Sequence, residues 1–212
     1  MNFNMEIMEN PPLKNQLYIK LNQQQHVVEY LLDGFKKFGF DETINYIMKN
    51  YVIKDDLCLD EKTGSSIQRL IDQNKKLPAG APAPDFVLPD INGREVYLSN
   101  IKAKKILVLF YASWCPHCQT IISQIKDLFK SRDKKELEIV AISLDSKKED
   151  WSDLIKKNGL DWINVSDQKG WNGRAVSDYY IYATPTMFLL DKDRKILGKP
   201  LSIEDLKKIL FY

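Results

Sequence analysis

Apolar residues in the first third of the chain recur at the three- and four-residue spacing of amphipathic helices. One stripe lies within residues 27–35, a second within 44–51, and a third within 67–71. Asp41 precedes the second stripe and is a suitable N-cap residue. The pattern predicts three short helices, and no catalytic or metal-binding motif accompanies them.

A proline-rich segment interrupts this pattern at residues 77–84, which read LPAGAPAP. Three prolines and one glycine in eight residues cannot continue a helix. We therefore expect a helical N-terminal extension over residues 1–77 and a second domain over residues 78–212, with the proline-rich segment leading into it.

Beyond this segment, short strands alternate with helices. The run 105–111 is apolar with β-branched and aromatic side chains, which is typical of a strand buried on both faces. Ser202, three residues before Asp205, predicts an N-cap for the last helix. The alternation predicts an α/β sandwich with parallel crossovers. We expect further strands over 137–144, 162–165, 186–190 and 195–197, helices over 115–129, 147–157 and 203–210, and a hairpin of 85–88 with 96–98 around Asn92-Gly93.

Charge and hydropathy narrow the functional classes. The 212 residues include 31 basic and 29 acidic side chains, a net charge of +2, which argues against an extended nucleic-acid-binding surface. The longest apolar run, Ile106–Ala112, is seven residues, whereas a bilayer span needs about 20, so no membrane span is predicted. Residues 1–10 lack the basic start and apolar core of a secretory signal. The sequence is therefore expected either to be cytoplasmic or to start downstream of a signal.

Two of the three cysteines, Cys115 and Cys118, form one CxxC between a buried strand and a helix. A helix N-terminus stabilises a thiolate, so Cys115 is the predicted nucleophile. Cys118, one turn further on, is placed to resolve a mixed disulfide. Pro116 suits the first helical position. His117 can donate to, or when charged pair with, the Cys115 thiolate, which would favour the reduced form.

Other interpretations of the two thiols explain the pattern less well. A structural disulfide at this spacing closes almost no loop. Half of a zinc site would lack its second pair, because His26 and Cys58 are isolated. Inert core thiols would not require a Pro-His insert at a helix start. We therefore expect a redox site without a metal or cofactor, with Cys58 as a bystander.

Thr184-Pro185 forms a second candidate element, directly before the predicted strand at 186–190. Proline cannot sit inside a central strand, but a cis peptide can shape a loop beside an active site. We predict that this peptide bond is cis.

These motifs resemble the thioredoxin superfamily. Trp114–Cys118 matches its WCxxC motif, and Thr184-Pro185 matches its cis-proline loop. Within the superfamily, the region from Pro82 resembles the TlpA/ResA-like bacterial thiol-disulfide oxidoreductases. The matching segments are 83–86, 90–93, 110–115, 141–145 and 190–191. The resemblance implies a thioredoxin-like three-layer sandwich with a central mixed sheet, preceded by a small all-α extension.

The same resemblance implies roles for the site residues. Cys115 would attack and Cys118 would resolve, while Pro185 would meet the substrate backbone. Thr184 would tune the disulfide and offer polar contacts, and Trp114 would form a flat apolar wall. The partners would be protein thiols or disulfides and an upstream redox partner, in the periplasm or cell envelope.

Two positions depart from the family pattern. Leu109 stands where thioredoxin-type sites often keep a buried acid, and Ile121 stands where ResA-like sites often keep a glutamate. The proton of Cys118 would then leave through His117, water or Asp145. We expect its release to be slow and to speed up with pH.

Two further functions stay open. The region also resembles peroxiredoxins, but their motif needs Pro seven residues and Thr three residues before the reactive cysteine. Val108 and Ala112 stand there before Cys115, and Tyr111 and Cys115 before Cys118. Neither set of positions fits, which disfavours peroxide reduction as the main activity and leaves a thiol peroxidase as the second candidate. A non-catalytic redox-sensing or interaction module, with the helical extension binding a partner, is the third. The direction of electron flow and the oligomeric state are not predicted.

Overall fold

The computed structural model describes residues 61–130 and 133–211, and residues 31, 34, 43, 46 and 47 singly. Apart from those single positions, the two helices predicted within 27–51 lie outside the described residues, as do His26 and Cys58. The third predicted helix is confirmed as α4, Glu61–Lys76. The chain divides into two compact units, 1–68 and 69–212. The second half of α4 therefore belongs to the unit that contains the sheet, and the division predicted at residue 77 stays a prediction.

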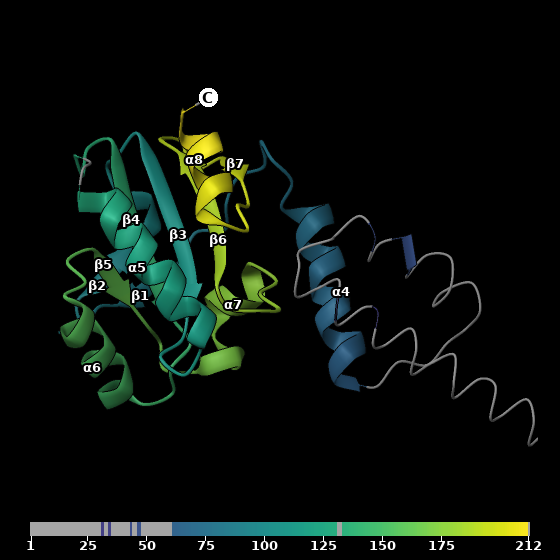
Figure 1. Ribbon diagram of the computed structural model, residues 1–212, viewed down its shortest axis with the longest axis horizontal. Helices are drawn as coiled ribbons and strands as arrows, with labels where there is room; N and C mark the ends of the chain where they lie inside the picture. The colour runs from purple at the N-terminus through teal and green to yellow at the C-terminus, as the bar shows by residue number, and fades with distance from the viewer. Residues whose placement is uncertain are drawn as a thin grey trace, which may run out of the picture. The chain divides into compact units, whose positions relative to one another are not determined.

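A mixed five-stranded sheet forms the centre of this second unit, in the order β5-β4-β3-β6-β7 (Figure 1). The strands are β3 (Lys105–Tyr111), β4 (Leu137–Ser143), β5 (Ile163–Val165), β6 (Thr186–Asp191) and β7 (Ile196–Gly198). β3, β4 and β5 run parallel, whereas β6 and β7 pair antiparallel. The α/β class and the mixed sheet are confirmed, and the parallel crossovers are restricted to β3, β4 and β5.

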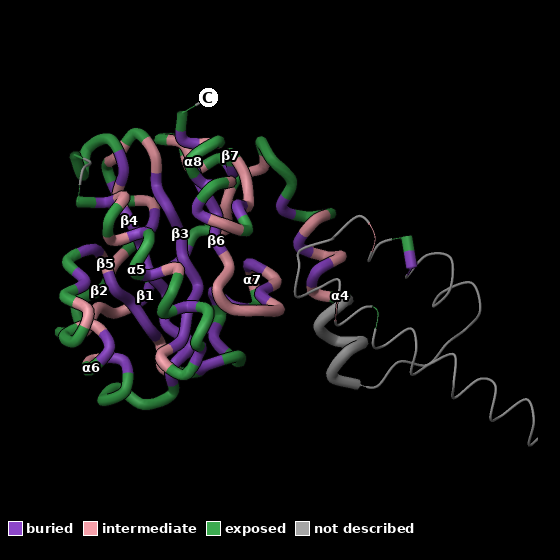
Figure 2. The backbone as a smooth tube through the Cα atoms, viewed as in Figure 1, coloured by how far each residue is buried: buried purple, intermediate pink, exposed green. Residues whose placement is uncertain are grey.

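The two faces of β3 are both buried, as its apolar run predicts. Neighbouring side chains in a strand point to opposite faces. Tyr111 accepts a hydrogen bond from Trp151 of α6 (Lys148–Asn158) on one face, 3.0 Å long. Phe110 packs against Tyr179 on the other face, with ring centroids 5.1 Å apart. Figure 2 shows the continuous buried strand at the centre of the unit. The CxxC segment therefore starts from a rigid support.

The predicted helices after the CxxC are also present. They are α5 (Pro116–Lys130), α6 and α8 (Ile203–Phe211), and α5 and α8 lie in contact. Ser202 Oγ accepts the backbone N–H of Asp205 at 3.1 Å, which confirms the predicted N-cap. The sequence did not predict α7 (Arg174–Asp178), because five residues are too few to show helical periodicity. No described helix has the length and apolar character that spanning a membrane requires.

The hairpin forms around Asn92-Gly93, with β1 (Val87–Pro89) antiparallel to β2 (Glu95–Tyr97). Its turn is held by Asp90, whose carboxylate accepts the backbone N–H groups of Asn92 and Arg94 at 2.8 and 2.9 Å. These bonds lower the pKa of Asp90.

The proline-rich segment leads extended along the β7 side of the sheet. Gly80 N–H donates to Ile196 O at 2.7 Å, and Ala83 N–H donates to Arg194 O at 2.9 Å. Its backbone is thus part of the sheet unit, which explains why the unit begins before the prolines.

Candidate redox site

The CxxC lies at the turn from β3 into α5. β3 ends at Tyr111 and α5 begins at Pro116. The turn is closed by backbone hydrogen bonds, from Cys115 N–H to Ala112 O at 3.3 Å and from Cys118 N–H to Cys115 O at 3.1 Å. Pro116 occupies the first helical position, where its missing N–H removes no helical bond. Cys115 therefore stands directly before the helix N-terminus.

The Cys115 sulfur forms hydrogen bonds to the start of α5 and to the proline loop, which is 69 residues away in the sequence. The Cys118 N–H donates to Cys115 Sγ at 3.2 Å, and the Cys115 thiol donates to the Thr184 carbonyl at 3.4 Å. The Thr184–Pro185 peptide bond is cis. The fold thus brings the CxxC and the proline loop into direct contact, as the sequence motifs suggested.

The two cysteines differ in accessibility. Cys115 is 6% exposed and Cys118 is fully buried, and both are free thiols. Burial raises the pKa of Cys118 well above its ordinary value, and hydrogen bonding with Cys115 acts in the same direction. The Ala112 backbone and the Thr184 side chain oppose this rise to a smaller extent. Cys118 therefore keeps its proton at neutral pH.

Among the described residues, no hydrogen bond joins Cys118 Sγ to either proton acceptor considered from the sequence. His117 is exposed on α5. Asp145 is 1% exposed and is already used by two serines. Ser113 Oγ donates to its carboxylate at 2.6 Å, and Ser143 Oγ donates at 2.7 Å. The Ser113 backbone N–H adds a third bond at 3.1 Å.

The reason for this Asp145 contact is the parallel pairing of β3 and β4. Tyr111 and Ser143 are register partners at the ends of the two strands. Ser113 and Asp145 each follow two residues later, so they meet at the same edge of the sheet. The carboxylate therefore anchors the loop that precedes Cys115. The sequence drew attention to Asp145 but did not show its serine partners.

A series of buried side-chain hydrogen bonds lies at the end of β3, directly before the same loop. Trp151 Nε1–H donates to Tyr111 Oη at 3.0 Å, and Tyr111 Oη–H donates to Asn164 at 3.4 Å. Burial raises the pKa of Tyr111, so its hydroxyl stays protonated. These hydrogen bonds fix the end of β3 that precedes the CxxC.

Two exposed tryptophans flank the site. Trp114 is 54% exposed, and Trp171, in the short turn Gly170–Asn172, is 41% exposed. Their ring centroids are 6.4 Å apart with an interplanar angle of 46°. The sequence indicated Trp114 but missed Trp171, because nothing in the local pattern around Trp171 points to the CxxC.

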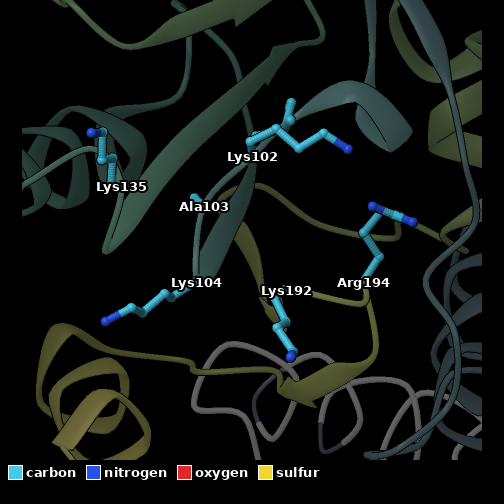
Figure 3. Close-up of a pocket in the computed structure, with 7 residues that line it drawn as sticks. Lys102, Ala103, Lys104, Lys135, Lys192 and Arg194 are labelled. Carbon is cyan, nitrogen blue, oxygen red and sulfur yellow. The ribbon is translucent and has the colours of Figure 1, made fainter.

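A basic pocket of about 430 Å³ lies away from the cysteines (Figure 3). Its lining comes from residues 101–104, directly before β3, and from Lys135, Lys192 and Arg194, whereas Cys115 follows the opposite end of β3. The labelled lysine and arginine side chains extend in different directions rather than converging. In the part of the chain that the structure describes, no group of three or more His, Cys, Asp or Glu side chains could hold a metal ion. The basic pocket is therefore separate from the candidate redox site.

Known proteins similar to this chain match the same region. A sequence model of the AhpC/TSA family matches residues 79–198. The thiol-disulfide oxidoreductase ResA of Geobacillus thermodenitrificans is 30% identical over 134 residues, which cover 62% of this chain and 75% of the relative. The C-terminal domain of a proposed thiol-disulfide oxidoreductase from Bacteroides thetaiotaomicron is 38% identical with a TM-score of 0.59, covering 63% of this chain and 93% of that one. A thiol-disulfide oxidoreductase from Bacteroides fragilis is 31% identical with a TM-score of 0.57, covering 61% and 97%.

Proposed function

The chain belongs to the AhpC/TSA family as a TlpA/ResA-like thiol-disulfide oxidoreductase of the thioredoxin superfamily, and from this premise we propose that Cys115 and Cys118 are its working pair. In this proposal the pair exchanges disulfides with protein substrates. The observation that carries it is the asymmetry of the two thiols, because Cys115 is 6% exposed whereas Cys118 is fully buried, and the Cys115 sulfur accepts the Cys118 N–H at 3.2 Å.

In the reducing direction, the Cys115 thiolate attacks one sulfur of a substrate disulfide. The Cys115–substrate bond forms, the substrate S–S bond breaks, and the first substrate thiolate leaves. Cys118 then loses its proton and attacks Cys115 Sγ, which releases the second substrate thiolate. Two electrons pass to the substrate and the Cys115–Cys118 disulfide remains. The oxidising direction is the same sequence in reverse.

The surroundings support the first of these steps. The Cys118 N–H and the start of α5 stabilise negative charge at Cys115 Sγ. The Thr184 carbonyl, 3.4 Å away, holds the thiol in place beside Pro185. In this proposal the substrate backbone lies along Thr184 and Pro185, and Trp114 contacts an adjacent side chain. His117 is exposed beside the pair and would act on its potential.

The second step requires the proton of Cys118 to leave a buried site. Leu109 and Ile121 provide no acid at the positions that relatives often use. Because burial raises the Cys118 pKa, we propose that resolution limits turnover and speeds up with pH. The proton would pass to water admitted when the Cys115 mixed disulfide forms.

The central experiment is to trap the mixed disulfide with a reduced protein and a disulfide substrate such as insulin. We expect Cys118→Ser to accumulate a covalent adduct at Cys115, detected by intact mass and peptide mapping. Cys115→Ser should form none, and Cys58→Ser should behave as the unaltered protein. An adduct at Cys118 or Cys58, or no exchange at all, would reject the proposal and leave a non-catalytic module. Sulfenic acid formed faster with peroxide than the adduct forms with insulin would favour a thiol peroxidase.

The direction of electron flow follows from the reduction potential of the pair in glutathione buffers. A value near −270 mV, as in thioredoxin, would indicate a reductase, and one near −120 mV an oxidant. Placement in the cell envelope rests on the resemblance, and the cytoplasm is the alternative. Cell fractionation with an antibody to the protein distinguishes the two.

A further inference from the structure

The two exposed tryptophans beside Cys115 form a surface that the exchange chemistry itself does not require. The other two tryptophans, Trp151 and Trp162, are 1% and 5% exposed. Trp114 and Trp171 instead leave about half of their surface exposed to water, and their ring centroids are 6.4 Å apart. Adjacent exposed aromatic side chains are typical of sites that bind an apolar partner group.

The turn that carries Trp171 is held by contacts of the residues before it, while the Trp171 ring itself is 41% exposed. Ser166 Oγ–H donates to Ser143 O at 2.9 Å, which ties the start of the loop to the end of β4. Gly170 has φ +56°, and a Cβ there would lie 3.1 Å from Ser146 Oγ. The turn is therefore closely packed on the sheet edge next to Asp145. A preorganised aromatic side chain loses little conformational freedom when it binds.

We propose that Trp114 and Trp171 together bind an aromatic or large aliphatic side chain adjacent to the substrate cysteine. This inference rests on the proposed function, because it assigns a substrate class to the same site. The surface is continuous with Cys115 through the Trp114–Cys115 peptide bond. The occupant is therefore an apolar segment of a polypeptide, attached to the cysteine whose sulfur reacts.

The test compares two peptides that differ at one residue next to their single cysteine, Phe in one and Ser in the other. Each cysteine carries thionitrobenzoate as a disulfide, so attack by Cys115 on the peptide sulfur releases coloured thionitrobenzoate. The Cys118→Ser protein stops the reaction at this stage. We expect the Phe peptide to react about tenfold faster, because only its side chain can contact the two tryptophans.

Trp171→Ala should reduce this preference to less than about threefold, and Trp171→Phe should keep most of it. Leu197→Ala, which removes an exposed apolar side chain on β7, should leave it unchanged. The rate with the small aliphatic reagent hydroxyethyl disulfide, followed by intact mass, should be the same in all variants, because this reagent has no side chain for the tryptophans to bind. An unchanged preference in Trp171→Ala would overturn the inference, whereas no reaction of Cys115 with the small reagent would instead reject the proposed function.

A second observation concerns α4 and stands independently of the tryptophans. Gln73, 3% exposed, donates its side-chain amide to Tyr179 O at 3.0 Å and to Tyr180 O at 3.3 Å. Arg69 donates to Ile181 O at 3.0 Å. Lys76 Nζ lies 4.6 Å from the centroid of the Tyr180 ring. Three consecutive residues are thus held by one helix.

The segment held in this way needs support. Tyr180 has φ +51°, a left-handed conformation that is unfavourable for a tyrosine. Ile181 lies three residues before Thr184, whose carbonyl accepts the Cys115 thiol. We infer that α4 positions the Thr184–Pro185 loop against Cys115, with Gln73 and Arg69 as positioning residues.

Hydrogen exchange followed by mass spectrometry tests this in the full chain. Gln73→Ala should speed amide exchange in a peptide covering residues 180–186 by about tenfold or more relative to a peptide from β4. Arg69→Ala should also speed exchange in this peptide. Lys75 is exposed on the same helix, so Lys75→Ala should leave the exchange rate unchanged. Unchanged exchange over 180–186, or an equal increase across the whole sheet, would overturn the inference. The readout does not depend on redox activity, so it is separate from the proposed function.

Discussion

Removal of the Asp145 carboxylate should loosen the loop that carries the CxxC. The side chain accepts two short hydroxyl bonds, from Ser113 at 2.6 Å and Ser143 at 2.7 Å, and one backbone N–H from Ser113. Hydrogen bonds to a charged group contribute about 1.5–3 kcal/mol each, so the two hydroxyl bonds alone account for roughly 3–6 kcal/mol. The Asp145 carboxylate is 1% exposed, so removing it also removes the desolvation cost of a buried charge, which offsets part of this loss.

We therefore expect Asp145→Ala to lower the free energy of unfolding by about 3 kcal/mol. Asp145→Asn should cost only about 1 kcal/mol, because its amide oxygen can still accept from Ser113 while Ser143 reorients its hydroxyl. For a chain of this size, about 3 kcal/mol corresponds to a fall in Tm of roughly 6–12 °C.

Urea unfolding of the reduced proteins, followed by tryptophan fluorescence, measures both values. Asp153→Ala, an exposed position on α6, is the matched control and should stay within about 0.5 kcal/mol. A loss below about 1 kcal/mol for Asp145→Ala, or an equal loss for both Asp145 variants, would show that the charge-assisted bonds do not hold the loop.

Three further predictions follow from other contacts. The pKa of Cys118 is raised in the folded state, so the unfolded chain loses this proton first, and stability falls as pH rises above about 8.5. Urea unfolding midpoints at pH 7–10 should fall in this way for the reduced protein and fall less for the oxidised protein. The rate at which the Cys115 mixed disulfide is released should also increase between pH 6 and 9. A release rate that does not change with pH would contradict the raised pKa of Cys118. Tyr111→Phe should cost about 1–3 kcal/mol, because it leaves the buried Trp151 N–H without its acceptor; an unfolding free energy equal to that of the unaltered protein would refute this. Gly198→Ala should destabilise the protein by about 1 kcal/mol, because the added Cβ would lie 2.7 Å from Ile209 Cδ1. Adding Ile209→Val, which removes Cδ1, should restore part of this loss in thermal unfolding. No recovery in the double variant would show that this contact is not the source of the strain.

The local parts of the fold could be predicted because each leaves a periodic or compositional pattern. The apolar run 105–111 became β3, buried on both faces, and Ser202 became the N-cap of α8. α7 left no such pattern in five residues. The pairing of β6 antiparallel to β3 also has no local signal, because it depends on how a distant segment returns to the sheet.

The sequence by itself determined the chemistry that we propose for the site, since a strand, a CxxC and a helix start are contiguous and their electrostatics are local. The tertiary structure decided how that chemistry is supported. Asp145 meets Ser113 across 32 residues, and Gln73 meets Tyr179 across 106. Such contacts arise from strand register and helix packing, so no spacing in the sequence could show them. The contact of Trp171 with Trp114 has the same origin, and it turns a two-cysteine motif into a surface that we propose selects its substrate.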